Sequence, residues 1–211
     1  MARGRFIAFE GGEGAGKSTQ ARLLAEALRG RGLDVVLTRE PGGTEGAEAI
    51  RRLLLDTAGS GWNPAAEALL FAAARSDHVD RLIRPALERG AWVVCDRFVD
   101  STRAYQGGGG GLSDDDILEL HRIGSGGLLP DLTILLEASG EEIAARLQRR
   151  DGGESDRIGG REAAFHARVG DAFRRLAAAE PARFAVIDGS ASAGVTHQAI
   201  LRAISSLAET S

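Results

Sequence analysis

Residues 11–18 read Gly11-Gly12-Glu13-Gly14-Ala15-Gly16-Lys17-Ser18, which matches the pattern G-x-x-x-x-G-K-[ST] at every fixed position. A short apolar run at residues 6–9 precedes the stretch, and leucines and alanines at helical spacing follow it over residues 23–28. A strand that enters a glycine-rich turn and continues as a helix directs several backbone N–H groups at one point, where the positive end of the helix dipole also lies. The stretch therefore predicts a site for the phosphates of a nucleotide.

Lys17 is the only lysine in a chain with 26 lysine and arginine residues. Retaining one lysine among arginines indicates a position that needs a compact ammonium group rather than a planar guanidinium. We expect the Lys17 ammonium to neutralise β- and γ-phosphate oxygens and the Ser18 hydroxyl to ligate Mg²⁺. The residues expected to bind the nucleoside triphosphate are Gly11, Gly12, Glu13, Gly14, Ala15, Gly16, Lys17, Ser18 and Thr19.

Length and charge restrict the class of protein. A chain of 211 residues suits one α/β domain, residues 1–211, whose core needs no disulfide or metal. The net charge of −4 argues against binding to polymeric nucleic acid, which needs a basic face. Nothing resembles a signal peptide, and no run approaches the ~18 apolar residues of a membrane span. The single cysteine, Cys95, lies in an apolar run and is expected in the core, which fits a reducing, cytoplasmic setting.

Apolar runs and helical patterns alternate along the chain. Strands are expected at residues 6–9, 33–38, 91–95, 132–136 and 184–187. Helices are expected between them, including a long helical region over residues 64–89 that Gly90 ends. The alternation predicts a three-layer α/β fold, with a five-stranded parallel sheet flanked by helices. Glycines 107–111 are expected to form a loop, because a glycine run does not favour regular structure.

Two classes of phosphate-loop protein are disfavoured by the remaining sequence. Guanine-specific GTPases use an N-K-x-D element, but the one asparagine here, Asn63, precedes proline, and there is no second lysine. Motor and sensor ATPases usually have a strand that ends in Asp-Glu, whereas the third expected strand ends in Asp96-Arg97.

Four arginines indicate a second phosphate site. Arg39, Arg51, Arg75 and Arg97 fall on loops or helix starts around the first three strands, where a parallel sheet gathers ligands at its carboxyl edge. Guanidinium groups hold phosphate oxygens bidentately, as an acceptor monophosphate requires. This arrangement favours a kinase that acts on a small phosphorylated acceptor.

Several segments carry a resemblance to a known family. They are Glu10–Thr19, Thr38-Arg-Glu-Pro-Gly-Gly-Thr44, Ile50–Asp56, Phe71–Arg75, Asp96-Arg97, Ser101-Thr-Arg-Ala-Tyr-Gln-Gly107 and Asp156-Arg157. Many families share the phosphate loop, but the second segment together with Ala-Tyr-Gln-Gly-Gly-Gly after Asp-Arg is highly specific. On these segments the chain resembles the bacterial thymidylate kinases over essentially its whole length. The resemblance implies a P-loop NTPase fold with a lid, ATP-dependent phosphorylation of dTMP to dTDP in dTTP biosynthesis, Mg²⁺ as a cofactor, and a homodimer packed through the long helices.

The resemblance also implies roles for individual residues. Those implied to bind dTMP are Arg39, Glu40, Pro41, Arg51, Phe71, Arg75, Arg97, Thr102, Tyr105 and Gln106. Arg97 is implied to bridge the acceptor phosphate and the γ-phosphate, and Glu13, an acid inside the phosphate loop, to help arrange the acceptor. Asp96 suits Mg²⁺ binding through water, with a helix cap or an ion pair as the alternative. Helical spacing makes Phe71 a core residue, whereas the resemblance has it stack on the thymine ring.

Three residues that follow Asp96-Arg97 are expected to contact the base and sugar. Thr102 and Gln106 lie one helical turn apart and are expected to form hydrogen bonds to the base or sugar. Tyr105 is expected to occupy the place of a ribose 2′-hydroxyl, which would select deoxyribose by exclusion.

The polar, glycine-interrupted segment 149–160 is expected to form a lid that excludes water during transfer. Family members that have Gly-Ala rather than a basic residue inside the phosphate loop, as at Gly14-Ala15, place the catalytic arginine in this lid. The residues expected to be catalytic are therefore Lys17, Glu13, Arg97 and, in no fixed order, Arg149, Arg150 and Arg157.

One position departs from the family pattern. Relatives commonly have an acid two residues after the Asp-Arg of the lid, where this chain has Gly159. A contact to the acceptor or to Mg²⁺ is then either absent or supplied by Asp156 or Glu162.

Two other functions stay open at this point. A kinase for a different nucleoside monophosphate would use the same phosphate sites. A nucleotide-binding module without catalysis would bind ATP without turnover, although the arginine-rich lid argues against it.

Overall fold

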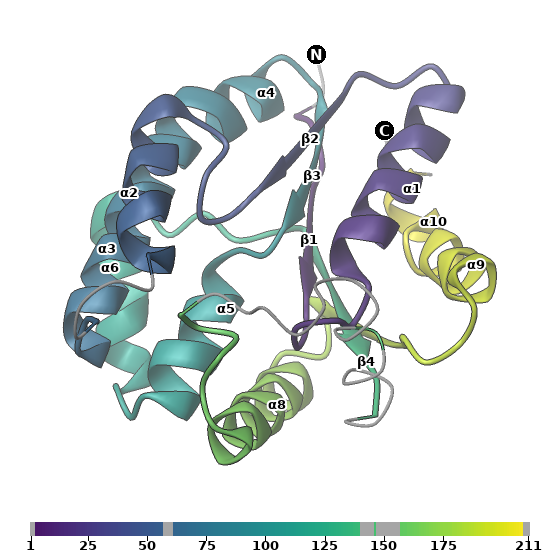
Figure 1. Ribbon diagram of the computed structural model, residues 1–211. Coiled ribbons are helices and arrows are strands. Elements are labelled where there is room, and N and C mark those ends of the chain that lie inside the picture. The colour runs from purple at the N-terminus through teal and green to yellow at the C-terminus, as the bar shows by residue number, and fades with distance from the viewer. Residues whose placement is uncertain (1–2, 57–60, 140–145, 147–156, 209–211) are drawn as a thin grey trace.

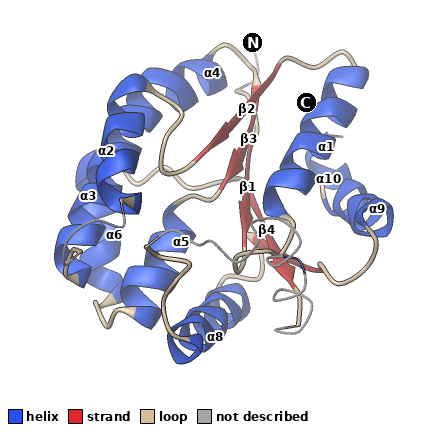
Figure 2. Ribbon diagram, viewed as in Figure 1, coloured by secondary structure: helices blue, strands red, loops and turns tan. Residues whose placement is uncertain are grey.

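One sheet of five parallel strands, in the order β2-β3-β1-β4-β5, forms the centre of the fold (Figures 1 and 2). The computed structural model describes residues 3–56, 61–139, 146 and 157–208. The strands are β1 (Phe6–Glu10), β2 (Val35–Arg39), β3 (Trp92–Asp96), β4 (Leu132–Glu137) and β5 (Phe184–Asp188). The predicted fold class and all five predicted strands are confirmed.

Helices cover both faces of this sheet, with α1 and α9 on one side and α2, α3, α4 and α6 on the other (Figures 1 and 2). The α-helices are α1 (Lys17–Gly30), α2 (Glu45–Leu55), α3 (Pro64–His78), α4 (Arg84–Glu88), α5 (Val99–Thr102), α6 (Asp114–Ser125), α8 (Ala163–Ala179), α9 (Ala193–Ala203) and α10 (Ser205–Ala208). Two π-helical segments, η1 (Val79–Ile83) and η2 (Arg103–Gly109), continue α3 and α5 respectively. The long helical region predicted over residues 64–89 is thus α3, η1 and α4 in succession.

Alternate residues of the central strand β1 serve the two faces of the sheet. Ile7 and Phe9 pack in a buried cluster with residues of α1 and α9, including Leu24. Phe6 and Ala8 point the other way and pack with residues of η1 and β3. Since a strand buried on both faces has no solvated side, β1 reads as a continuous apolar run that ends in an acid.

The prediction that glycines 107–111 form a loop is wrong for the first three of them, which belong to η2. These glycines allow close packing rather than a turn. A Cβ atom at Gly108 would lie 2.3 Å from the Cβ of Ala172, and one at Gly109 would lie 2.5 Å from the Phe165 ring. Because helix α8 approaches η2 so closely, tertiary packing stabilises a helical conformation that glycine alone disfavours.

The structure also bears on two expectations from composition, the burial of Cys95 and the membrane-spanning character of the helices. Cys95 is buried, and burial raises the pKa of its thiol well above the ordinary value, in keeping with a core residue. Within the described ranges, none of the helices has the length and apolar character needed to cross a bilayer.

We expect Gly108→Ala to lower the free energy of unfolding by about 1–3 kcal/mol, because overpacking forces neighbouring atoms to move. Gly30→Ala is the matched control, since a Cβ atom at this last residue of α1 meets nothing within 4 Å. The control is expected to be neutral or to stabilise the fold by up to about 1 kcal/mol. Denaturant unfolding measures both variants, and equal stability of the two would contradict a packing role for Gly108.

Candidate active site

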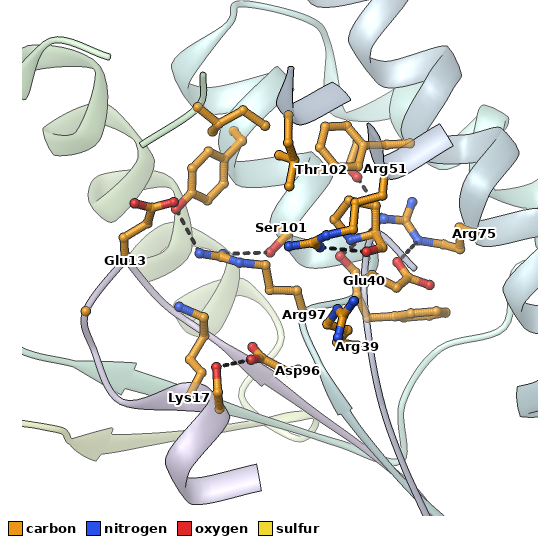
Figure 3. A pocket seen from close by; sticks show the side chains of 18 of the residues that line it. Glu13, Lys17, Arg39, Glu40, Arg51, Arg75, Asp96, Arg97, Ser101 and Thr102 are labelled. Atoms are coloured by element: carbon orange, nitrogen blue, oxygen red, sulfur yellow. Dashed lines mark hydrogen bonds and ion pairs between the residues drawn. The ribbon is translucent and has the colours of Figure 1, made fainter. Parts of the chain in front are cut away.

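A pocket of about 480 Å³ lies at the carboxyl ends of β1, β2 and β3 (Figure 3). The residues predicted from the sequence that line it are Glu13, Gly14, Gly16, Lys17, Ser18, Thr19, Arg39, Glu40, Pro41, Arg51, Phe71, Arg75, Asp96, Arg97, Thr102, Tyr105 and Gln106. The structure therefore brings the predicted triphosphate site and the predicted acceptor site into one cavity. Gly11, Gly12 and Ala15 belong to the same loop but do not line the cavity.

Lys17 begins helix α1 at the end of the phosphate loop. Its side chain is buried, and its Nζ donates a hydrogen bond to the carbonyl of Gly12 at 2.6 Å. Burial and the nearby Arg97 guanidinium lower the pKa of Lys17 to about 7. Two cations that face one cavity repel each other, so a polyphosphate between them would remove an unfavourable interaction.

Ser18 and Asp96 bring two oxygen ligands together beside Lys17. The Ser18 hydroxyl donates to Oδ2 of Asp96 at 2.5 Å, which joins the start of α1 to the end of β3. Oδ1 of Asp96 is buried, and no described residue donates to it. A carboxylate oxygen in that position is suited to a divalent cation or to its bound water, because Mg²⁺ prefers oxygen ligands.

Arg97 occupies the left-handed region of backbone conformation, with φ of 71°, which is uncommon for a residue with a side chain. Its amide donates to the Phe9 carbonyl at 2.9 Å, and its own carbonyl accepts from the Cys95 thiol at 3.0 Å. Its guanidinium donates to the Gly11 carbonyl at 3.2 Å and to the Ser101 hydroxyl at 3.1 Å. These contacts hold the Arg97 side chain between the phosphate loop and the wall formed by α5 and η2 (Figure 3).

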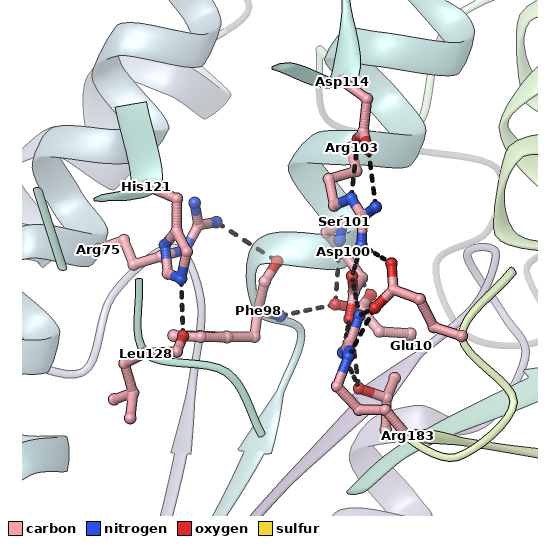
Figure 4. A network of polar contacts seen from close by, with 12 residues as sticks. Glu10, Arg75, Phe98, Asp100, Ser101, Arg103, Asp114, His121, Leu128 and Arg183 are labelled. Atoms are coloured by element: carbon pink, nitrogen blue, oxygen red, sulfur yellow. Dashed lines mark hydrogen bonds and ion pairs between the residues drawn. The ribbon is translucent and has the colours of Figure 1, made fainter. Parts of the chain in front are cut away.

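Glu10, the last residue of β1, holds the turn that follows Arg97. Its Oε1 accepts from the backbone amides of Phe98 at 2.8 Å and Ser101 at 3.0 Å, and its Oε2 accepts from the Ser101 hydroxyl at 2.6 Å (Figure 4). Burial, with a smaller contribution from Asp100, raises the pKa of Glu10 to about 7 against the opposing effects of Arg97 and these hydrogen bonds. Ser101 thus joins the Glu10 carboxylate to the Arg97 guanidinium.

Asp100 anchors the same turn from its other side. It is fully buried and accepts from Arg103 at 3.0 Å and from Arg183 at 2.6 Å (Figure 4). Arg103 also pairs with Asp114 and Glu180, at 2.7 Å in each case. Several elements are therefore tied to α5 through paired charges, as buried charges require.

Arg75 lies in α3, at the end of the pocket where the acceptor is predicted to bind. Its Nε donates to Glu40 at 2.8 Å, and its Nη2 donates to the Thr102 hydroxyl at 2.9 Å. Glu40 also contacts Nδ1 of the buried His78 at 3.0 Å, and Nε2 of His78 lies 2.8 Å from the Thr38 hydroxyl. Although burial alone would raise the pKa of Glu40, Arg75 and His78 outweigh burial and hold this pKa below its ordinary value. Glu40 is therefore a carboxylate that fixes the Arg75 guanidinium.

The other predicted acceptor arginines approach the pocket from its β2 side. Arg51 donates to the Pro41 carbonyl at 2.7 Å, which holds its guanidinium against the loop after β2. Arg39 is more exposed and pairs with Glu48 at 2.9 Å. The neighbouring Arg52 is exposed and does not line the pocket, as expected for a surface residue.

Two aromatic residues line the same end of the pocket. Phe71 is half-buried and also packs against the cluster under α8, so its predicted roles as a core residue and as a stacking surface are compatible. The Tyr105 hydroxyl accepts from Arg97 at 3.3 Å, while its ring packs against Phe165 and Phe173 of α8. The position of Tyr105 is thus fixed on both sides.

Glu13 lies beside Gly159, the position at which this chain differs from the family pattern. A Cβ atom at residue 159 would lie 2.3 Å from Oε2 of Glu13, so a side chain there would require the Glu13 carboxylate to move. The phosphate loop thus places an acid beside residue 159, the described end of the predicted lid segment. Of the two residues considered as substitutes, Asp156 lies outside the described residues and Glu162 precedes α8.

The predicted lid arginines are placed only in part. Arg149 and Arg150 lie outside the described residues. Arg157 donates from its Nε to the Asp56 carbonyl at 2.5 Å and does not line the pocket. Arg146 does line it, with Nη1 3.5 Å from the carbonyls of Gly14 and Ala15 and Nη2 3.3 Å from that of Ser190.

Sequence reasoning missed several residues that shape the site. Glu10 and Ser101 belong to the segments that carry the family resemblance but have no predicted role, and Arg146 is not among the predicted catalytic arginines. Leu55 and Ile158 also line the pocket. Glu10 could have been found from the sequence, because an acid that directly follows a buried apolar run needs a partner.

The free energy of unfolding of the wild-type chain is expected to fall, relative to Glu10→Gln, as the pH rises from 4.5 to about 7. The folded state holds the Glu10 proton more tightly than the unfolded chain, so this contribution is complete below pH 4.5 and lost above the folded pKa. The slope is at most about 1.4 kcal/mol per pH unit. Urea unfolding across this range measures the difference. Glu26→Gln, on the exposed face of α1, is the control, and parallel pH profiles for wild type and Glu10→Gln would refute the prediction.

Known proteins with similar sequences and structures agree on one family. A family model described as thymidylate kinase matches residues 9–200. The thymidylate kinase of Rhizorhabdus wittichii is 59% identical over 206 residues, 98% of each chain. That of a Bradyrhizobium species is 52% identical over 192 residues, 90% of this chain and 85% of the relative. The crystal structure of thymidylate kinase from Ehrlichia chaffeensis has a TM-score of 0.78 and 34% identity, covering 96% of this chain and 98% of that one. The chain therefore belongs to the thymidylate kinase family.

Proposed function

We propose that this chain, as a thymidylate kinase, transfers the γ-phosphoryl group of ATP to dTMP within the pocket described above. The observation that carries the proposal is the position of Arg97. Its guanidinium contacts the phosphate loop at Gly11 and the acceptor wall at Ser101 and Tyr105. A cation held between the two nucleotide sites can contact both the γ-phosphate and the acceptor phosphate.

The residues of the pocket suit phosphoryl transfer, which depends on positioning and on neutralisation of charge. An oxygen of the acceptor phosphate is already a nucleophile, so the site needs no strong base. Lys17 would neutralise the triphosphate, Arg97 the group in transfer, and Arg51 the acceptor phosphate. Glu13 would help to arrange the acceptor, and Arg39 and Pro41 would complete the wall around its phosphate.

Ser18 and Asp96 are the residues proposed to hold Mg²⁺, Asp96 through bound water. Their adjacent oxygens and the unpartnered Oδ1 of Asp96 support this assignment. When bound, the cation would neutralise negative charge on the phosphate oxygens of ATP. In the described part of the chain, no group of three or more His, Cys, Asp or Glu residues could hold a metal. This pattern fits Mg²⁺, which usually takes its remaining ligands from water and substrate phosphates.

The far end of the pocket is proposed to bind the thymine ring and its sugar. Nη1 of Arg75 donates to none of the described residues, so it can donate to the ring's 4-oxo group. Phe71 offers a face for stacking, Thr102 and Gln106 offer polar contacts to the base, and Tyr105 stands where a 2′-hydroxyl would have to fit. Selection of dTMP would then combine a donor, an aromatic face and steric exclusion.

The lid arginines complete the proposed catalytic set. Arg149, Arg150 and Arg157 remain the candidates for the side chain that stabilises the transferred group when the lid excludes water. Arg146 contacts the phosphate loop, and its contact to Ser190 connects that loop to the turn after β5. A cytoplasmic location remains an expectation from the sequence.

In a coupled assay with ATP and Mg²⁺, we expect ADP formation with dTMP to exceed that with dUMP, UMP, CMP, AMP and GMP. Arg97→Ala is expected to lower kcat by about 100-fold or more, because it removes a donor to the transferring group. Arg51→Ala is expected to raise the KM for dTMP at least roughly tenfold, through loss of a charge-assisted contact. The exposed Arg52, next in α2, supplies the matched control Arg52→Ala, which should alter neither constant.

Several outcomes of this assay would overturn the proposal. If ADP formation were faster with another monophosphate, that nucleotide rather than dTMP would be the acceptor. ATP binding without any ADP formation would instead indicate a nucleotide-binding module. Full activity of Arg97→Ala would contradict the assigned position of the acceptor phosphate.

We also propose a homodimer formed through α3 and α6, which pack against each other on one face of the sheet. Leu69 of α3 and Ile123 of α6 are large apolar residues with 56% and 68% exposure. The double substitution Leu69→Glu/Ile123→Glu is expected to convert the dimer to a monomer, because it places charges in an apolar interface. Sedimentation velocity measures the state, with Val195→Glu on α9 as the control. A monomeric wild-type chain would contradict this interface.

A further inference from the structure

Glu67 is a buried acid of α3 that does not line the pocket. It is 2% exposed, and each of its carboxylate oxygens has a partner from a different part of the chain. Oε1 accepts from Nη2 of Arg161, which lies in the segment that leads into α8. Oε2 accepts from Nε2 of Gln106, in η2, at 3.1 Å. Glu67 therefore connects that segment to a side chain of the acceptor site.

The contact to Glu67 fixes which way the Gln106 amide points. A carboxylate oxygen only accepts hydrogen bonds, so the NH₂ group of Gln106 must face Glu67. The amide carbonyl oxygen, Oε1, is then turned away from Glu67. Gln106 lines the pocket, and none of the described residues donates to this oxygen. Gln106 therefore presents an acceptor to a bound base.

Arg75 presents the opposite character at the same end of the pocket. Its guanidinium has only donors, and two of its nitrogens are occupied by Glu40, Phe98 and Thr102. The site thus offers a donor from Arg75 and an acceptor from Gln106. A pyrimidine with a 4-oxo group and an N3–H group matches this pair. Cytosine has the reverse pattern, a 4-amino donor beside an N3 acceptor.

We infer that Glu67 is a specificity-determining positioning residue, which excludes cytosine nucleotides by locking the Gln106 amide with its carbonyl toward the base. The inference rests on the proposed binding of the base at Arg75 and Gln106. Arg161 supplies the opposite charge that a buried carboxylate requires, and it is itself held over the Phe165 ring at 4.6 Å. The pair Glu67–Arg161 therefore acts on the base only through Gln106.

The substitution Glu67→Gln tests the lock. Arg161 needs an acceptor, so the oxygen of the new amide at position 67 would stay with it, and the NH₂ group of that amide would face Gln106. Gln106 would then turn its carbonyl toward position 67 and its NH₂ group toward the base. We expect the ratio of kcat/KM for dTMP to that for dCMP to fall about 100-fold, since sites built to hydrogen-bond a substrate group discriminate strongly.

The ratio of kcat/KM for dTMP to that for dUMP is the internal control. Uracil has the same 4-oxo and N3–H groups as thymine, so this ratio should stay within about twofold of the wild-type ratio. General damage to the fold would lower kcat/KM for all three nucleotides together. Glu26→Gln, an exposed acid of α1 that pairs only with Arg22 among the described residues, should leave both ratios unchanged.

The double variant Glu67→Gln/Gln106→Glu gives a second test that does not depend on the stability of the single variant. The NH₂ group introduced at position 67 would donate to one oxygen of the carboxylate introduced at position 106. The other oxygen of that carboxylate would again present an acceptor to the base. We expect the double variant to recover at least tenfold of the lost discrimination against dCMP.

Unchanged dCMP discrimination in Glu67→Gln, or no recovery in the double variant, would overturn the inference. A wild-type enzyme that does not phosphorylate dTMP would instead overturn the proposed function.

Discussion

A buried carboxylate at the end of the central strand holds the two halves of this active site together. Glu10 accepts hydrogen bonds from two backbone amides and a hydroxyl of the turn that follows Arg97. Arg97 itself has a left-handed backbone conformation, which costs of order 1–2 kcal/mol. The same strand continues directly into the phosphate loop. Glu10 thus links the strand that leads into the phosphate loop to the turn beside Arg97.

Two further acids hold side chains at the end of the pocket where the acceptor is predicted to bind. Glu40 occupies one edge of the Arg75 guanidinium, and Glu67 occupies the amide of Gln106. Each acid takes up some of the donors of a side chain proposed to bind the acceptor and leaves its remaining groups free for that ligand. A flexible side chain held in this way loses little conformational entropy on binding, so more of the contact energy remains for recognition. Glu67, which does not line the pocket, would therefore influence the substrate only through Gln106.

Local patterns in the sequence predicted the strands, the phosphate loop and the arginines at the strand ends, because each depends on neighbours along the chain. The contacts through which acids hold the side chains of the site were not predicted, although Glu40 itself was expected in the site. Glu10 and Ser101 are 91 positions apart, and Glu67 and Arg161 are 94 apart, so no local pattern records either pairing. The loop predicted for the glycines of η2 was wrong for the same reason. Their conformation is set by the approach of α8, which the sequence of that segment does not contain.

Glu13 lies beside Gly159, so the phosphate loop and the described end of the predicted lid segment are neighbours. A Cβ atom at residue 159 would lie 2.3 Å from Oε2 of Glu13, so an acidic side chain at 159 would require the Glu13 carboxylate to move and would face a like charge. The glycine at position 159 thus lets the Glu13 carboxylate keep the position it has in this structure. In this chain the negative charge beside residue 159 therefore comes from the phosphate loop, which begins at the end of the central strand.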